Sequence, residues 1–431
     1  SDVYKRQAML FLRSEDIMNI NDTLFIFLCT LLVWLMTPGL SLFYGGLVQS
    51  KNVLDTIMQS MAAIVVVTVA WIVLGFTLSF APGTSWIGGL QYFFAQHVGF
   101  STQTELSPHI PFALFMIFQL MFCTIAVSIL SGSISEKMKF FPYLIFVFVW
   151  VIVVYSPVAH WVWGGGWIDR LGAIDYAGGT VVHISSGVSG LVLAMMIGAG
   201  RTFDKRPPHN LVISLIGAIM VWLGWYGFNV GSAYTFNAIA MTAFVNTVLG
   251  ASAGALSWMA MEYLTKRTTS LVGMLSGVLA GLVTITPAAG YVHLISALIL
   301  SGIGGIGCFF TINYIKVKLN YNDALDAFGL HGMGGIIGAL LTGVFQSHQI
   351  NSKIADGLLL GGNWYAVVVQ FIAVAVTLLF SGIMTFLIAK IIGRFSELGT
   401  TEDEEEVGLD YIQHGERAYF YGELNKLNHR L

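Results

Sequence analysis

Two stretches decide the fold of this chain: DYAGGTVVHISSGVSGLV (residues 175–192) and DALDAFGLHGMGGIIGAL (residues 323–340). Each has an aspartate, a histidine eight residues later, and glycines four and seven residues beyond the histidine. The matching residues are Asp175, His183, Gly187 and Gly190 in the first stretch and Asp323, His331, Gly335 and Gly338 in the second. Ionisable side chains are costly and rare in apolar segments of this kind. The repeat therefore indicates a duplicated functional site centred on the histidines.

Chance is the alternative explanation of the repeat. The chain contains 48 glycines, so the glycine matches carry little weight by themselves. The paired aspartates and histidines carry the argument.

The composition is that of a membrane protein. Charged residues make up 10% of 431, hydrophobic residues 56%, and the mean hydropathy is +0.77, whereas soluble chains carry about 25% charged residues. The net charge of −3 and the lack of a basic patch give no reason to expect a nucleic-acid partner. Cys29, Cys123 and Cys308 lie in apolar segments and are interpreted as small core residues, not as a disulfide framework or a metal set.

Eleven apolar segments are long enough to span a bilayer. None contains Asp, Glu, Lys or Arg in its interior. They are residues 24–48, 56–80, 111–133, 140–160, 180–200, 210–232, 235–261, 270–288, 290–315, 329–347 and 364–390. Lipid offers no partner for free backbone groups, and short alternating strands are absent, so we predict helices and not a β-barrel. The predicted fold class is an all-α membrane protein with eleven transmembrane helices.

The loop charges predict the orientation. One set of alternate loops holds twelve cations: Lys51, Lys137, Lys139, Arg201, Lys205, Arg206, Lys266, Arg267, Lys316, Lys318, Lys390 and Arg394. The opposite loops hold only Arg170 and Lys353. Because cytoplasmic loops are rich in Lys and Arg, we expect the N-terminus outside, the C-terminus in the cytoplasm, and the protein in the cell membrane.

The histidines fall in the fifth and tenth segments. Two copies of five helices must run in opposite directions, which is the inverted-repeat plan of many transporters, with the substrate path between the repeats. We therefore divide the chain into an extracytoplasmic extension, a membrane domain and a cytoplasmic tail. The parts are residues 1–21, 22–394 (repeat one about 22–200, repeat two about 210–347, extra helix about 364–390) and 395–431.

The chain resembles the ammonium transporters of the Amt/Mep/Rh superfamily, on the Amt side. The resemblance runs from about Asp22 to Tyr419. It is carried by MTPGLSLFYGGLVQSKNVL (36–54), AHWVWGGGW (159–167), DYAGGTVVH (175–183), GWYGFNVGSA (224–233), AFVNT (243–247), GLVTITPAAGYV (281–292), DAFGLHG (326–332) and HGERAY (414–419). It implies an ammonium channel or transporter, assembled as a homotrimer with one pore in each subunit.

The resemblance also implies roles along the pore. Trp163, Phe122 and Ser232 would form an external recruitment site, and Phe122 with Phe228 a gate. Aromatic faces attract cations by about 0.5–2 kcal/mol. Trp163 has an ordinary alternative role as an interfacial anchor beside Trp161 and Trp167, and any one of 30 phenylalanines is by default core or lipid-facing.

Below the gate, the resemblance places His183 and His331 edge to edge, sharing a proton, with Trp225 towards the inner end. Potassium cannot escape the cost of entering a dry lumen, of order 20 kcal/mol for a bare ion, whereas ammonium can by losing its proton. The resemblance makes Asp175 necessary for conduction, and its place near the start of a span favours capping of the helix start over contact with the ion. Asp326, in the family's DxFGxH motif, has more weight than Asp323.

Other functions stay open at this point. A sensor that binds ammonium and signals through a partner would use the same site. A membrane metalloenzyme using His183, His331 and Asp175 ranks last, because no clustered ligands such as HExxH occur. We expect no enzyme activity, no cofactor and no metal. The expected substrates are ammonium and, more weakly, methylammonium, and small residues at 302–305 suit contacts between subunits.

The polar C-terminus matches the family's regulatory tail at Asp410, Gly415, Glu416 and Arg417. The resemblance implies that the tail docks beneath a neighbouring subunit and helps to position a PII-type signal protein. Charge-assisted bonds to the basic loop 201–206 would hold it. The acidic run Glu402 to Glu406 is interpreted as a solvated spacer. The alternative is a disordered tail with no role.

Overall fold

The computed structural model describes residues 18–103, 105–198 and 207–419. Within these ranges it contains helices and four isolated β-bridges, and no strand. The first five apolar segments are α2 (Ile20–Leu47); α3, η1 and α4 (Val53–Ala70, Trp71–Gly75, Phe76–Phe80); α5 (Phe112–Ile134); α6, η3 and α7 (Phe140–Trp150, Val151–Tyr155, Ser156–Trp163); and η4 with α9 (Gly179–Ile184, Ser185–Ile197).

The other six follow in the same way. They are α10 (Leu211–Gly231); α11 (Ala238–Lys266); α12 (Leu271–Ile285); α13, η5 and α14 (Leu294–Phe310, Thr311–Ile315, Lys316–Leu319); η6 with α15 (Phe328–Gly332, Met333–Phe345); and α16 (Trp364–Ile392). Short helices outside these segments are α8 (Trp167–Leu171), α17 (Glu402–Val407) and α18 (Leu409–His414), with single 3₁₀ turns at Phe93–Ala95 and Leu358–Leu360.

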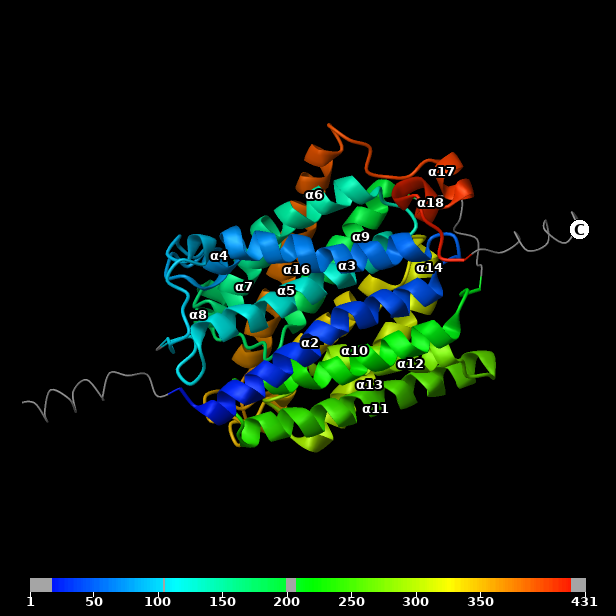
Figure 1. Ribbon diagram of the computed structural model, residues 1–431. Helices are drawn as coiled ribbons and strands as arrows, with labels where there is room; N and C mark the ends of the chain where they lie inside the picture. Colours follow the sequence, from blue (N-terminus) through cyan, green and yellow to red (C-terminus); the bar gives the residue numbers. More distant parts are fainter. Residues whose placement is uncertain (1–17, 104, 199–206, 420–431) are drawn as a thin grey trace, which may run out of the picture.

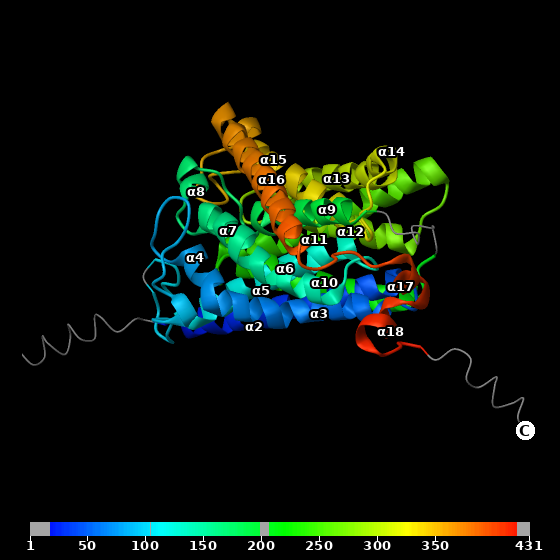
Figure 2. The same ribbon diagram turned by 90° about the horizontal axis from the view of Figure 1, so that it is seen from above.

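The predicted fold class is confirmed. Each of the eleven predicted segments coincides with a helical segment, and ten of those in the described residues are long and apolar enough to span a membrane. The remaining one, α12, is shorter, at 15 residues. Figure 1 shows the long helices side by side between an end that carries α4, α7 and α8 and an opposite end that carries α14, α17 and α18. Seen from above, α16 crosses the flank of this bundle (Figure 2).

Small residues allow the helices to approach closely, as membrane helices require. Helices α2 and α10 pack along their lengths, and a Cβ added at Gly217 would lie 2.2 Å from the backbone nitrogen of Phe43. The same test corrects half of the prediction that the small residues at 302–305 suit contacts between subunits. A Cβ at Gly304 would lie 2.0 Å from Thr284 and one at Gly305 2.2 Å from Ser257, so these glycines serve packing within the chain; only Gly302 has open space.

The C-terminal segment folds against the end of the bundle that carries α14 (Figure 1). The acidic run is not a solvated spacer: Thr401 and Glu404 form a capping box that starts α17, and Glu405 is only 5% exposed. The Lys51 ammonium donates to the carbonyl oxygens of Glu405 and Glu406. A capping box satisfies the free amides of a helix start, which explains why this charged run is helical.

Helix α18 is held by a buried carboxylate of α3. Asp55 is fully buried; Gln413 Nε2 donates to its Oδ1 at 3.0 Å, and His414 Nε2 lies 3.0 Å from the same oxygen. The Asp55 backbone amide donates to Asp410 at 2.9 Å. These contacts are within one chain, and the loop 201–206, the predicted partner of the tail, lies outside the described residues.

Candidate functional site

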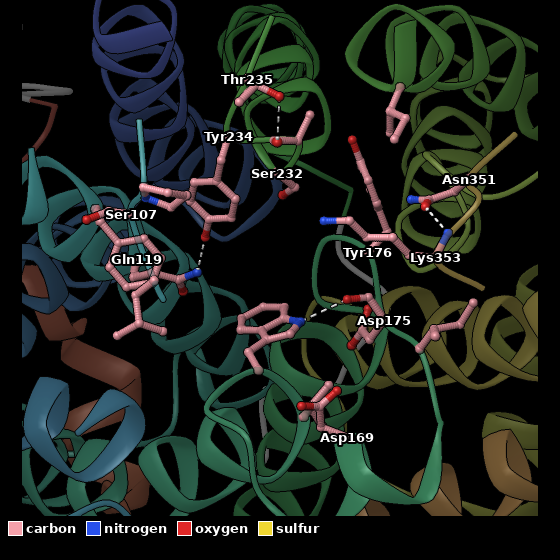
Figure 3. Close-up of a pocket in the computed structure, with 18 of the residues that line it drawn as sticks. Ser107, Gln119, Asp169, Asp175, Tyr176, Ser232, Tyr234, Thr235, Asn351 and Lys353 are labelled. Carbon is pink, nitrogen blue, oxygen red and sulfur yellow. Dashed lines mark hydrogen bonds between the residues drawn. The ribbon is translucent and has the colours of Figure 1, made fainter. Parts of the chain in front are cut away.

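A cavity of about 600 Å³ opens at the end of the bundle that carries α7 and α8. Residues from α5, α7, the segment before η4 and the loop after α10 line it (Figure 3). The cavity brings together all three residues of the predicted recruitment site, Trp163, Phe122 and Ser232. Asp169 and Asp175 also line it.

Two phenylalanines are stacked beneath this cavity. The rings of Phe122 and Phe228 have centroids 4.1 Å apart and planes 14° apart, and both are buried. The Trp163 ring stands edge-on to Phe122 at 5.9 Å. Ser232 donates its hydroxyl proton to the carbonyl oxygen of Phe228 at 2.9 Å, which leaves the lone pairs of its oxygen free to accept.

The two histidines lie on the far side of Phe228. Their Nδ1 atoms are 3.2 Å apart, with ring planes at 25°. Trp225 stacks on His183 at 5.3 Å and lies 6.5 Å from His331, while its indole Nε1 donates to Thr286. His183 Nε2 has no hydrogen-bond partner among the described residues. The aromatic rings thus form a continuous series from the cavity to the histidine pair.

Glycines let the two histidine segments meet. A Cβ at Gly187, four residues after His183, would lie 2.5 Å from the backbone nitrogen of Gly332. A Cβ at Gly335, four residues after His331, would lie 2.7 Å from the carbonyl oxygen of Gly179. The first glycine of each pattern is therefore required where the segments approach each other, a role that counting glycines could not reveal. The second glycines, Gly190 and Gly338, lie instead against Ser133 and Thr284.

Asp175 fixes the start of the first histidine segment. Its carboxylate accepts from the backbone amides of Gly178, Gly179, Thr180 and Val181, and from the hydroxyl of Thr180. The backbone carbonyl of Asp175 also accepts from Trp163 Nε1 at 2.8 Å (Figure 3). This carboxylate therefore caps η4 while its residue positions the tryptophan of the cavity.

Asp323 takes the corresponding place in the second segment. Its carboxylate accepts from the backbone amides of Ala327 at 3.1 Å and Phe328 at 2.8 Å, at the start of η6. Asp326, which the sequence analysis weighted above it, forms an ion pair with Lys316. Burial raises the pKa of Asp326, and the neighbouring ammonium of Lys316 opposes that rise. The two aspartates thus divide the work between capping and charge pairing.

Several cavity residues escaped the sequence analysis. Gln119, Tyr176 and Tyr234 line the cavity, and Phe118, which is not part of the lining, packs edge-on against Phe122 at 5.0 Å. The position of Phe118, one helical turn before Phe122, could have indicated it. Within the described residues, no group of three or more His, Cys, Asp or Glu side chains could hold a metal ion.

Comparison with known proteins identifies the family. The model of the Ammonium Transporter Family matches residues 24–419. The chain belongs to the ammonium transporter family. It is 50% identical over 402 residues to "Ammonium transporter" of Bacillus subtilis (strain 168), which covers 93% of this chain and 99% of that protein.

Solved structures agree with this assignment. The crystal structure of Candida albicans Mep2 matches with a TM-score of 0.84 and 32% identity over 90% of this chain and 88% of that one. A structure described as "Sensor Amt Protein" matches with a TM-score of 0.84 and 26% identity, covering 91% and 98%. The chain is therefore a multi-pass membrane transporter of ammonium and not an enzyme.

Proposed function

We propose that this transporter recruits ammonium in the outer cavity, removes its proton, and conducts ammonia along the histidine pair. The observation that carries the proposal is the stacked pair of Phe122 and Phe228, which lies between the cavity and the histidines. A hydrated cation does not pass two rings in contact, so the species that crosses must be small and stripped of water.

Recruitment is assigned to Trp163, Phe122 and Ser232. The indole N–H of Trp163 is occupied by the Asp175 carbonyl, so the face of the ring is what remains for a cation. Cation–π attraction is about 0.5–2 kcal/mol per ring, enough to gather ammonium without trapping it. The free lone pairs of the Ser232 oxygen accept a hydrogen bond from an ammonium N–H, which potassium cannot offer.

Conduction is assigned to His183, His331 and Trp225. Two neutral imidazoles with facing Nδ1 atoms share one proton, so each ring keeps a donor or an acceptor for ammonia. The proton removed from ammonium is either returned outside or relayed separately past the pair. A bare ion that enters this buried lumen meets a desolvation cost of order 20 kcal/mol, which only a deprotonable cation avoids.

The test is a comparison of currents in proteoliposomes. We expect the wild-type protein to transport ammonium and, more weakly, methylammonium. Transport is read as current where the proton is relayed and as a rise of internal pH where it is returned outside, and potassium should give neither signal. His183→Ala and His331→Ala should either lose at least about tenfold in ammonium current or admit potassium, because lumen polarity changes. Equal ammonium and potassium currents in the wild type would refute the proposal, and unchanged currents in both variants would make the histidines structural.

The remaining assignments extend this proposal. Asp175 supports conduction by capping the first histidine segment, and Asp326 by its ion pair with Lys316 beside the second. The membrane domain comprises two inverted halves, about residues 22–200 and 210–347, plus the helix at 364–390. Support comes from the two histidine segments, which begin at opposite ends of the molecule: Asp175 lines the outer cavity, whereas Asp323 lies beside the inner Lys316. The cavity faces outward across the cell membrane, and three subunits assemble with one pore each.

The tail is proposed to be regulatory. The contacts of Asp410 with α3 support a docked tail, Gly415 ends α18 in a left-handed conformation, and the Arg417 guanidinium lies 5.0 Å from the Tyr411 ring. The amide of Glu416 donates back to the Asp410 carbonyl, which tightens this turn. A docked tail at the inner end can help to position a PII-type protein.

Sensing is the second candidate function. It is supported by the similarity to the structure described as a sensor, but the higher identity is to proteins described as transporters. Proteoliposomes that contain no other protein separate the two, because a transporter gives either an ammonium current or an ammonium-dependent rise of internal pH, whereas a sensor without transport gives neither.

A further inference from the structure

Tyr234 closes one side of the outer cavity in a strained conformation. It lies in the loop between α10 and α11, two residues after Ser232, and lines the cavity (Figure 3). Its φ of 57° places a bulky side chain in the left-handed region, which costs of order 1–3 kcal/mol and persists only where the surroundings enforce it. Strain of this kind at a binding cavity points to a role for the side chain that is held there.

Gln119 of α5 is the group that holds this tyrosine. Its amide Nε2 donates to the phenol oxygen of Tyr234 at 2.5 Å, a bond drawn in Figure 3. Gln119 is only 4% exposed, and its Oε1 has no hydrogen-bond partner among the described residues. The bond joins the loop after α10 to α5, so the two elements that carry Ser232 and Phe122 are tied together.

The ring of Tyr234 continues the aromatic series towards the gate. It packs on Phe115 at 5.4 Å and edge-on against Phe118 at 5.7 Å. Phe118 in turn packs edge-on against Phe122 at 5.0 Å, and a Cβ added at Gly231 would come within 2.7 Å of the Phe118 ring. Because Phe118 is fully buried and in close contact with Gly231, the ring series forms a packed wall that resists displacement by a larger ligand.

We propose that Tyr234, locked by Gln119, is a specificity-determining residue that limits the size of the amine accepted beside Trp163 and Ser232. A fixed wall accommodates ammonium, whereas the methyl group of methylammonium must displace the ring or leave its own N–H groups poorly placed. Discrimination by one methyl group in a packed pocket reaches about tenfold or more. The inference rests on the proposed recruitment site and adds the residue that makes it selective.

The experiment measures KM and maximal rate for ammonium and for methylammonium in proteoliposomes. The quantity read is the ratio of the two KM values, methylammonium over ammonium. We expect Tyr234→Ala to lower this ratio by about fivefold and Tyr234→Phe by about twofold. Tyr226→Phe is the matched control: it changes a tyrosine of α10 that packs on Phe244, outside the cavity lining, and should leave the ratio unchanged.

The tether has its own test, which does not depend on Tyr234→Ala folding. Gln119→Leu removes the same hydrogen bond as Tyr234→Phe, so the double variant should lower the ratio no further than either single variant. Additive effects would show that the bond is not the means of locking. A ratio that stays within about 1.5-fold of wild type in both Tyr234 variants overturns the proposal, as does an equal rise of both KM values, which is the mark of a purely structural residue.

A separate variant distinguishes this failure from failure of the recruitment site. Trp163→Leu should raise the KM for ammonium by about tenfold if that site exists. An unchanged KM in Trp163→Leu refutes the recruitment site and, with it, the placement of the size limit beside Trp163. A raised KM in Trp163→Leu with an unchanged ratio in the Tyr234 variants refutes only the role of Tyr234.

Discussion

The two histidine segments share a sequence pattern, but their first turns are held by different kinds of contact. At the outer end, Asp175 accepts five hydrogen bonds, all from neutral backbone and hydroxyl donors. At the inner end, Asp323 accepts two, and ammonium groups lie around it. Lys316 reaches the Asp323 carbonyl and the Asp326 carboxylate, and Lys137 donates to the Asn322 carbonyl at 3.0 Å.

The same sequence pattern is therefore held by neutral donors at one end of the molecule and surrounded by lysines at the other. A carboxylate held only by neutral donors has no positive charge beside it, so its field draws cations towards the cavity. Carboxylates beside lysines are neutralised, so the inner end does not retain a cation that forms there. We infer that the outer segment is built to attract and the inner segment to release and to be controlled.

The largest effects are expected when Asp175 or Asp323 is replaced by alanine. Asp175→Ala leaves four backbone amides at a buried turn without their acceptor, at about 1–3 kcal/mol each, so we expect ammonium current to fall by at least about 100-fold. Asp323→Ala removes the acceptor of only two backbone amides, and we expect the ammonium current to fall by about tenfold. Currents are measured at equal amounts of protein in the membrane.

Asp169→Asn is the control, because Asp169 is an exposed carboxylate that lines the same cavity and should change the current by less than about twofold. Equal losses in Asp175→Ala and Asp323→Ala would contradict the asymmetry between the segments.

The sequence predicted the fold, and the repeated pattern predicted that His183 and His331 belong together, because both rest on local pattern. Long apolar runs force helices in lipid, and the spacing of Asp175 and His183 repeats in the second segment. Local pattern could not predict contacts between residues that are far apart in the sequence. Nothing in the sequence showed that Gln119 would meet Tyr234, 115 positions away, or that Glu405 would be buried in a run of five acids. The sequence analysis weighted Asp326 above Asp323 and did not show that Asp323 caps η6, because a motif does not reveal which carboxylate faces the helix start.

Deleting residues 407–431 tests whether the tail supports the second histidine segment. The connector before the tail pairs with the loop that carries Lys137, through Lys139 N to Leu398 O and Thr400 N to Lys137 O. We expect the bundle to stay folded and transport to fall by about three- to fivefold, because the deletion removes the contacts of α18 with Asp55 that anchor the end of this connector.

Variants that combine the deletion with an aspartate substitution measure the energetic coupling between the tail and each histidine segment. The deletion should be less than additive with Asp323→Ala and additive with Asp175→Ala, which lies at the other end of the pore. Full activity of the truncated protein with undiminished PII binding would contradict a regulatory role of the tail.

The smallest expected effect concerns Lys137, the lysine beneath the inner segment. Its side chain is 4% exposed, and burial lowers the pKa of Lys137 from 10.5 to about 7. A depressed pKa means that stability is present above pH 10.5 and is lost as pH falls towards 7, so the free energy of unfolding should rise with pH across this window. We expect a rise of about 1–3 kcal/mol, which Lys137→Met should abolish by removing the charge. Thermal unfolding in detergent at pH 7 and pH 9 measures this change in the free energy of unfolding.

Lys139→Met is the matched control, since Lys139 forms an exposed ion pair with Glu397 and its loss should leave the pH dependence intact. Identical pH dependence in wild type and Lys137→Met would mean that the buried ammonium is fully compensated by its neighbours, and the inner segment would then be no more sensitive to pH than the outer one.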